Sequence, residues 1–122
     1  MKKILVIDDA PTVREQVRAA LGTSEFQVIE AVDGAEGLQK LEGDSEIAMV
    51  LCDINMPRLS GLELLDRLKT SGRIEKTPFV LLTSESQPGL IDRARKAGAK
   101  AWIVKPFKPT LLLAAMRRLL GA

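Results

Sequence analysis

The sequence predicts an α/β fold in which a doubly wound, five-stranded parallel sheet carries helices on both faces. Short apolar runs and amphipathic segments alternate five times along the chain without interruption, which is the pattern of parallel strands joined by crossover helices. Most of the runs are almost entirely apolar, as in strands that are buried on both faces. No linker, low-complexity tract or repeat interrupts the 122 residues. We therefore expect one domain over residues 1–122 and no output domain.

The apolar runs are short, aliphatic and bounded by turn signals, so each predicts a buried strand. The expected strands cover residues 3–7, 26–31, 49–52, 79–82 and 101–104. The expected helices begin at Pro11, after Asp33, after Ser60, at about Pro88 and at Pro109. The first ends at Gly22, the fourth runs to Ala97 and is stopped by Gly98, and the last ends at about Leu120.

Three of these helices have a recognisable start. Pro11 suits the first turn of a helix, where no amide hydrogen is needed. Asp33 with Glu36, and Ser60 with Glu63, have the spacing of a capping box, in which the two side chains bond to each other's backbone amides.

The composition excludes several classes of protein. A formal net charge of +2 is too small to indicate a nucleic-acid or membrane partner, and no cluster of basic residues with aromatic neighbours occurs. No apolar stretch approaches the roughly 20 residues of a membrane span, and the run after Lys3 is too short for a signal peptide. The single cysteine, Cys52, lies in an expected buried strand and is best explained as a reduced core thiol. We expect a cytoplasmic protein.

The carboxyl ends of the expected strands carry the residues of chemical interest. In open α/β sheets the functional crevice lies beyond these ends, where the strand order reverses. Three acids, one hydroxyl and one lysine follow strands one, three, four and five: Asp8, Asp9, Asp53, Thr83 and Lys105. Asp33 follows strand two and is expected to lie farther from the reversal point.

Such a group of acids needs a cation. Two carboxylates about 4 Å apart repel by about 4 kcal/mol at an effective dielectric constant of 20. Hard oxygen ligands, in a chain without histidine, favour Mg²⁺, Mn²⁺ or Ca²⁺ over zinc or copper, and few protein ligands favour Mg²⁺. A carboxylate beside such a metal can accept a phosphoryl group as an aspartyl-phosphate, while a lysine and a hydroxyl contact the phosphoryl oxygens. A phosphohistidine donor would have to come from another protein.

A set of motifs occurs in order along the chain: Asp8-Asp9, Asp53 with Met56-Pro57 and Gly61, Thr83, Gly98-Ala99, and Lys105-Pro106-Phe107. From residue 2 to about residue 120, the chain resembles the receiver domain of two-component response regulators, of the stand-alone, CheY-like kind. The resemblance implies a flavodoxin-like fold with strand order 2-1-3-4-5. It also implies a signalling switch, not an enzyme with a substrate, whose partners are a sensor histidine kinase or phosphotransfer protein and a downstream target.

The resemblance assigns roles to matching positions. Asp53 would be phosphorylated. Asp9, Asp53 and the carbonyl of Asn55 would bind Mg²⁺ (Mn²⁺ also fits) directly, and Asp8 mainly through water. Thr83 and Lys105 would hold the phosphoryl group, with help from the backbone amides of Asn55 and Ser84. The peptide bond before Pro106 would be cis.

Two of these positions would also belong to a switch. Thr83 would move toward the phosphoryl group, and the family couples this movement to an aromatic residue on strand five, which is Trp102 here. Since an indole is larger than the usual tyrosine or phenylalanine, we expect Trp102 to stay partly exposed. Together with Ile91 and Leu111, it would extend an apolar patch on the face formed by helix four, strand five and helix five. This face would contact the target or a second copy, in a monomer or weak homodimer.

Other readings of the same residues remain open. Asp8 and Asp9 could lie at a solvated strand end, or Asp9 could cap the first helix. Asp53 could be a turn residue, Thr83 could cap a turn, and Lys105 could be a surface lysine. The leucines of the apolar patch could be scattered over the surface. A haloacid-dehalogenase-like phosphatase would use the same nucleophile, but it usually has a second acid where this chain has Asn55. A flavodoxin-like cofactor binder would need a phosphate-binding loop after strand one, where two aspartates repel phosphate. Chemotaxis, a phosphorelay and control of a separate enzyme are all compatible with the sequence.

Overall fold

The computed structural model describes residues 1–56, 58–84 and 88–121, so Pro57 of the predicted motif lies outside the described residues. A five-stranded parallel sheet in the order β2-β1-β3-β4-β5 forms the centre of the domain, which confirms the predicted fold class and strand order. In chain order the elements are β1 (Lys2–Ile7), α1 (Pro11–Leu21), β2 (Phe26–Ala31), α2 (Gly34–Gly43), β3 (Ile47–Asp53), α3 (Gly61–Ser71), the 3₁₀-helix η1 (Arg73–Glu75), β4 (Phe79–Thr83), α4 (Pro88–Lys96), β5 (Ala101–Val104) and α5 (Pro109–Leu120).

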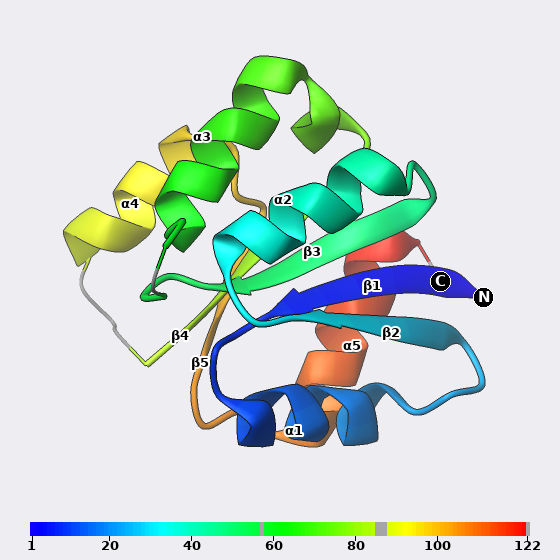
Figure 1. The fold of residues 1–122 in the computed structure, drawn as a ribbon. Coiled ribbons are helices and arrows are strands. Elements are labelled where there is room, and N and C mark those ends of the chain that lie inside the picture. Colours follow the sequence, from blue (N-terminus) through cyan, green and yellow to red (C-terminus); the bar gives the residue numbers. More distant parts are fainter. Residues whose placement is uncertain (57, 85–87, 122) are drawn as a thin grey trace.

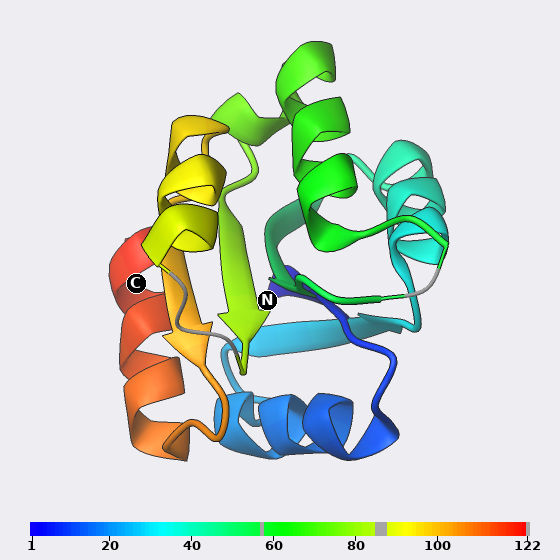
Figure 2. The same ribbon diagram turned by 90° about the vertical axis from the view of Figure 1, so that its left-hand side faces the viewer.

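Helices cover both faces of the sheet (Figures 1 and 2). Helices α1 and α5 lie on one face, and α2, α3 and α4 lie on the other. Side chains of β1 alternate between the two layers, because successive residues of a strand point to opposite faces. Leu5 and Ile7 pack in the layer under α2 and α3, whereas Ile4 and Val6 pack under α1 and α5. Both layers are apolar, which explains why the strands show no alternation of polar residues.

The third strand is longer than predicted, and one element was not predicted. β3 begins at Ile47 and not at residue 49, because Ile47 is buried and pairs with Lys3 of β1. Ala48, a weak strand former, hides this extension in the sequence. The η1 turn (Arg73–Glu75) follows α3, where we expected only a connection. The other predicted boundaries agree with the structure to within one residue, which is inside the usual uncertainty of helix and strand ends.

The two predicted capping boxes have different outcomes. At the start of α3, Ser60 and Glu63 form the complete reciprocal box. At the start of α2, the Asp33 carboxylate accepts a bond from the Glu36 amide, but the Glu36 carboxylate bonds to the amide of Val32 instead. Only half of the second box is therefore present.

Gly61 lets α3 begin directly against the end of β3. Its amide donates to the carbonyl of Ile54 at 3.1 Å. A Cβ atom at this position would lie 2.4 Å from the carbonyl oxygen of Asp53, closer than real Cβ atoms approach. Since that contact is with backbone, the strand end or the helix would have to move to admit a side chain.

We expect Gly61→Ala to destabilise the domain by about 1–3 kcal/mol, the usual cost of overpacking a tight site. Gly43→Ala is a matched control, because a Cβ at Gly43 meets nothing within 4 Å and alanine favours helix. Urea unfolding midpoints would measure both changes. Equal stability of the two variants would contradict the close packing of α3 on β3.

Candidate functional site

Three acidic side chains gather at the carboxyl edge of the sheet. Asp8 follows β1, Asp53 ends the neighbouring β3, and Asp9 begins the turn into α1. One carboxylate oxygen from each of the three lies within 4.8 Å of the other two. Asp8 is fully buried and Asp53 is 7% exposed, whereas Asp9 is exposed. The prediction that these acids share one edge is confirmed, and a solvated strand end is excluded for Asp8.

Lys105 supplies a positive charge to this cluster. It follows β5, and its ammonium Nζ lies 3.2 Å from Oδ2 of Asp8 and 3.5 Å from Oδ2 of Asp53. The side chain of Lys105 is only 18% exposed, so it is not an ordinary surface lysine. The Lys105–Pro106 peptide bond is cis, as the resemblance implied.

Burial of Asp53 raises the pKa of its carboxyl group above the usual value, and the negative charge of Asp8 raises it further. The ammonium of Lys105 acts in the opposite direction, as does the backbone amide of Asn55, which donates to Oδ1 of Asp53 at 3.4 Å. Burial comes first among these causes. The ionised form of Asp53 is therefore less favourable here than in water, and a further cation at this edge would stabilise it.

Cys52 lies beside Asp53 but does not contribute a reactive thiolate. It is fully buried, and burial raises its pKa well above the usual value; the charges of Asp53 and Asp8 add to this effect. A thiol with a raised pKa is a poor nucleophile at neutral pH. This agrees with the predicted core thiol.

The remaining predicted site residues lie at the same edge. Thr83 is buried at the end of β4, and its carbonyl accepts a bond from the amide of Lys105 at 2.8 Å. Asn55 and Ser84 are exposed, just beyond the ends of β3 and β4. Trp102 is 43% exposed on β5; whether it turns inward on phosphorylation stays a prediction.

Of the two acids considered as helix caps, one caps a helix and the other does not. Asp33 caps α2 and forms an ion pair with Arg58, with Nη1 3.2 Å from Oδ2, so it lies outside the cluster as expected. Asp9 does not cap α1, because the residue at that position is Ala10 and no side chain bonds to the helix start. The helix-cap reading of Asp9 is therefore wrong.

The acidic cluster suits a divalent metal ion. Its ligands would be hard carboxylate oxygens, which prefer Mg²⁺, Ca²⁺ or Mn²⁺. The chain has no histidine, and its single cysteine is buried in the sheet, so soft metals find no suitable ligands here. Asp8, Asp9 and Asp53 can thus hold a metal, with positions left for water or phosphate.

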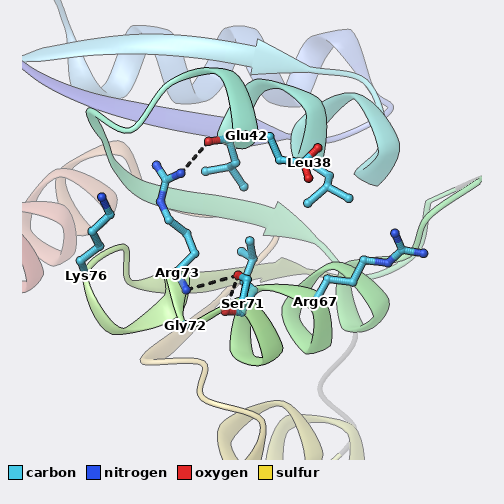
Figure 3. A pocket seen from close by; sticks show the side chains of 9 residues that line it. Leu38, Glu42, Arg67, Ser71, Gly72, Arg73 and Lys76 are labelled. Carbon is cyan, nitrogen blue, oxygen red and sulfur yellow. Dashed lines mark hydrogen bonds between the residues drawn. The ribbon is translucent and has the colours of Figure 1, made fainter.

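A pocket of about 470 Å³ lies at the opposite end of the sheet, between α2, α3 and η1 (Figure 3). Arg73 reaches across it toward α2, and its guanidinium donates to the carbonyls of Leu41, Asp44 and Ile47 and to the hydroxyl of Thr77. Arg73 therefore holds the ends of these elements together. None of the predicted site residues lines this pocket.

Arg14 and Glu30 were not among the predicted site residues. They form an ion pair, and Arg14 also donates to the backbone carbonyl of Asp8. Arg14 is one of two arginines on an amphipathic helix, and Glu30 is the only acid in a mostly apolar strand. No spacing rule links residues on different elements. Only the fold shows that the arginine turns back toward Asp8.

Comparisons with known proteins agree with this geometry. A family model described as the response regulator receiver domain matches residues 4–117. The chain is 32% identical to chemotaxis protein CheY1 of Helicobacter pylori over 120 residues, and the matched region covers 98% of this chain and 97% of that protein. The structure of the chemotaxis response regulator CheY4 of Vibrio cholerae is similar, with a TM-score of 0.89 and 32% identity over 98% of this chain and 99% of that one. Response regulator TrrA of Thermotoga maritima, in complex with Mg²⁺–BeF, gives a TM-score of 0.85 at 32% identity over 98% of this chain and 100% of that one.

The raised pKa of Asp53 predicts a stability that depends on pH. The pKa of Asp53 is higher in the folded protein than in the unfolded protein. Ionisation of Asp53 therefore destabilises the folded state once the pH exceeds the unfolded-state pKa, and this destabilisation reaches its full size above the folded-state pKa. In metal-free buffer we expect Asp53→Asn to be more stable than the parent at pH 7, with the advantage disappearing as the pH falls and Asp53 becomes protonated. Thermal unfolding over this pH range would measure the difference. Asp66→Asn, at an exposed position on α3, controls for the loss of one carboxylate, and an equal gain there would contradict the prediction.

Proposed function

Because this chain belongs to the response regulator receiver domain family, we propose that it is a cytoplasmic response regulator that is phosphorylated on Asp53. Domains of this family are signalling switches, and their partners are histidine kinases or phosphotransfer proteins. The phosphoryl group would come from a phosphohistidine of such a partner, in a Mg²⁺-dependent reaction. The observation that carries the proposal is the contact of Lys105 with both Asp8 and Asp53 inside the acidic cluster.

In the proposed reaction, an oxygen of the ionised Asp53 carboxylate attacks the phosphorus atom of the donor. The new O–P bond forms as the P–N bond to the partner's imidazole breaks, and the imidazole nitrogen leaves with the electron pair. The sequence contains no histidine, so the phosphoryl group cannot come from within the chain by this route. Water would reverse the modification by attacking the phosphorus of the acyl phosphate.

The cluster would neutralise charge during this transfer. Asp8, Asp9 and Asp53, with the carbonyl of Asn55, would hold Mg²⁺, and Mn²⁺ fits the same ligands. A bound Mg²⁺ supplies positive charge that offsets the charge of the carboxylate and the incoming phosphoryl oxygens. The complex of the related TrrA with Mg²⁺–BeF supports this choice of metal.

Lys105 and Thr83 would hold the transferred group. The Lys105 ammonium already lies 3.5 Å from Oδ2 of Asp53, so a phosphoryl group there would attract it as a point charge. Thr83 ends the neighbouring strand and would offer its hydroxyl group. Backbone amides of Asn55 and Ser84 would donate to the remaining oxygens; the Asn55 amide already donates to Asp53.

We further propose that β5 and α5, with α4, form the face that contacts a downstream protein. Trp102 and Val104 are each 43% exposed and Leu111 is 63% exposed. All three line one pocket of about 400 Å³ together with Phe107, so they form a continuous apolar surface and are not scattered. A target protein would cover this surface, and a second copy would do so in a weak homodimer. Because chemotaxis proteins are among the relatives, we favour a target protein that acts in chemotaxis. A role in a phosphorelay is the alternative.

Phosphorylation of Asp53 can be tested with acetyl phosphate and Mg²⁺. We expect intact-protein mass spectrometry to show the mass of one added phosphoryl group, stable in acid and lost in base, because acyl phosphates hydrolyse readily in base. EDTA and Asp53→Asn should each abolish it. Lys105→Met should lower the yield, whereas Lys100→Met, at an exposed lysine before β5, should not. An unchanged yield in Asp53→Asn would refute the assignment.

Coupling of the site to β5 can be tested with the single tryptophan. Beryllofluoride with Mg²⁺ mimics an acyl phosphate, and we expect it to change the emission of Trp102, because its exposed indole reports on its surroundings. Asp53→Asn should remove this response. If the emission does not change while the acetyl phosphate reaction succeeds, Trp102 has no part in the switch.

A further inference from the structure

Arg14 connects the acidic cluster to β2. It lies in α1, and its side chain is only 12% exposed. Nε donates to Oε1 of Glu30 on β2 at 2.9 Å, and Nη1 donates to the backbone carbonyl of Asp8 at 2.5 Å. One guanidinium therefore binds a carboxylate and a carbonyl at the same time, which its planar fork of donors allows.

The carbonyl that Arg14 binds belongs to the peptide group between Asp8 and Asp9. A peptide group is planar, so fixing its oxygen also fixes the direction in which the chain continues to the Cα atom of Asp9. The amide of Asp8 is held as well, because it donates to the carbonyl of Ala31 at 3.1 Å. Two connections thus hold the Asp8 backbone to β2. One is the direct bond to Ala31, and the other runs from the Asp8 carbonyl through Arg14 to Glu30.

Asp9 depends on this backbone for its position. The Asp8 carboxylate has partners of its own, the amide of Ala10 at 2.9 Å and the ammonium of Lys105 at 3.2 Å. The exposed carboxylate of Asp9, by contrast, makes no hydrogen bond or ion pair within the described part of the chain. The preceding peptide group therefore determines where the Cα atom of Asp9, and with it the base of this side chain, lies relative to the other two acids.

Glu30 holds Arg14 in this orientation. Its second oxygen accepts a bond from Nη2 of Arg18 at 2.5 Å, and its backbone carbonyl accepts one from Lys40. The Arg18 guanidinium, and then that of Arg14, lower the pKa of Glu30, so the acid stays ionised at neutral pH. Arg18 contacts Glu30 and the carbonyl of Val28, but it does not contact Asp8.

We propose that Arg14 is a positioning residue for the metal site: its bond to the Asp8 carbonyl, supported by Glu30, sets the Asp9 carboxylate for metal binding. The inference rests on the proposed function, because it requires that the acidic cluster binds a divalent ion. Groups that orient metal ligands from outside the coordination shell commonly change metal affinity by 10–100-fold when removed. Arg14 differs from those cases in that it acts on the backbone and not on the ligand side chain.

The test compares Arg14→Met with Arg18→Met. Methionine keeps the length and helix propensity of arginine but has no donors. Electron paramagnetic resonance of free Mn²⁺ would give the dissociation constant of each protein. We expect Arg14→Met to bind Mn²⁺ about tenfold more weakly and Arg18→Met to bind like the parent. Without metal, hydrogen exchange of the Ala10 amide should accelerate in Arg14→Met alone, because the turn between Asp8 and Ala10 loosens.

Thermal unfolding shows whether each variant folds. If Arg14→Met does not fold, Arg14→Lys serves instead, since one ammonium cannot keep both bonds of the guanidinium and weaker Mn²⁺ binding is again expected. Parent-like affinity in the folded Arg14 variant, or an equal loss in Arg18→Met, would overturn the inference while the proposed function stands. If the parent itself does not bind Mn²⁺, both fail.

Discussion

The folded domain brings the carboxylates of Asp8 and Asp53 close together, and they repel each other. Asp8 and Asp53 end neighbouring strands and are almost fully buried, and within the described chain Lys105 is the only cation in ion-pair contact with both. Burial and mutual repulsion together raise the pKa of Asp53. A site of this kind gains free energy from any further positive charge that reaches it. The repulsion between the carboxylates at the sheet edge therefore favours the binding of a divalent metal ion.

The parallel sheet holds these groups together without any loop having to bring them near. All strands run in one direction, so their carboxyl ends share one edge, and the order changes direction between β1 and β3. The connections after these two strands consequently cross to opposite faces and leave a crevice between them. Two local contacts then fix the walls: Gly61 lets α3 approach the carbonyl of Asp53, and the amide of Lys105 binds the carbonyl of Thr83.

Sequence patterns predicted the fold and the cluster because both depend on local signals. Continuous apolar runs indicate buried parallel strands, and the polar residues that end them must share an edge, so the amino-acid order alone is enough to group Asp8, Asp53 and Lys105. Contacts between side chains and distant backbone could not be predicted in this way. The bond of Arg14 to the Asp8 carbonyl, the pairing of Arg58 with Asp33 and the start of β3 at Ile47 all depend on how separate elements pack. Neither propensity nor periodicity contains that information.

The geometry of β5 gives a short route from the cluster to the proposed binding face. Trp102 and Val104 point outward on this strand, and Lys105 follows directly and reaches Asp8 and Asp53. Thr83 pairs with Val104 in the sheet register and accepts the Lys105 amide. A group that draws Lys105 and Thr83 toward Asp53 therefore pulls on the same short strand that presents the exposed indole. β5 is an edge strand of only four residues, so its backbone pairs on one side only, with β4. If Asp53 is phosphorylated as proposed, β5 would be a short connection between the added charge and the proposed binding face.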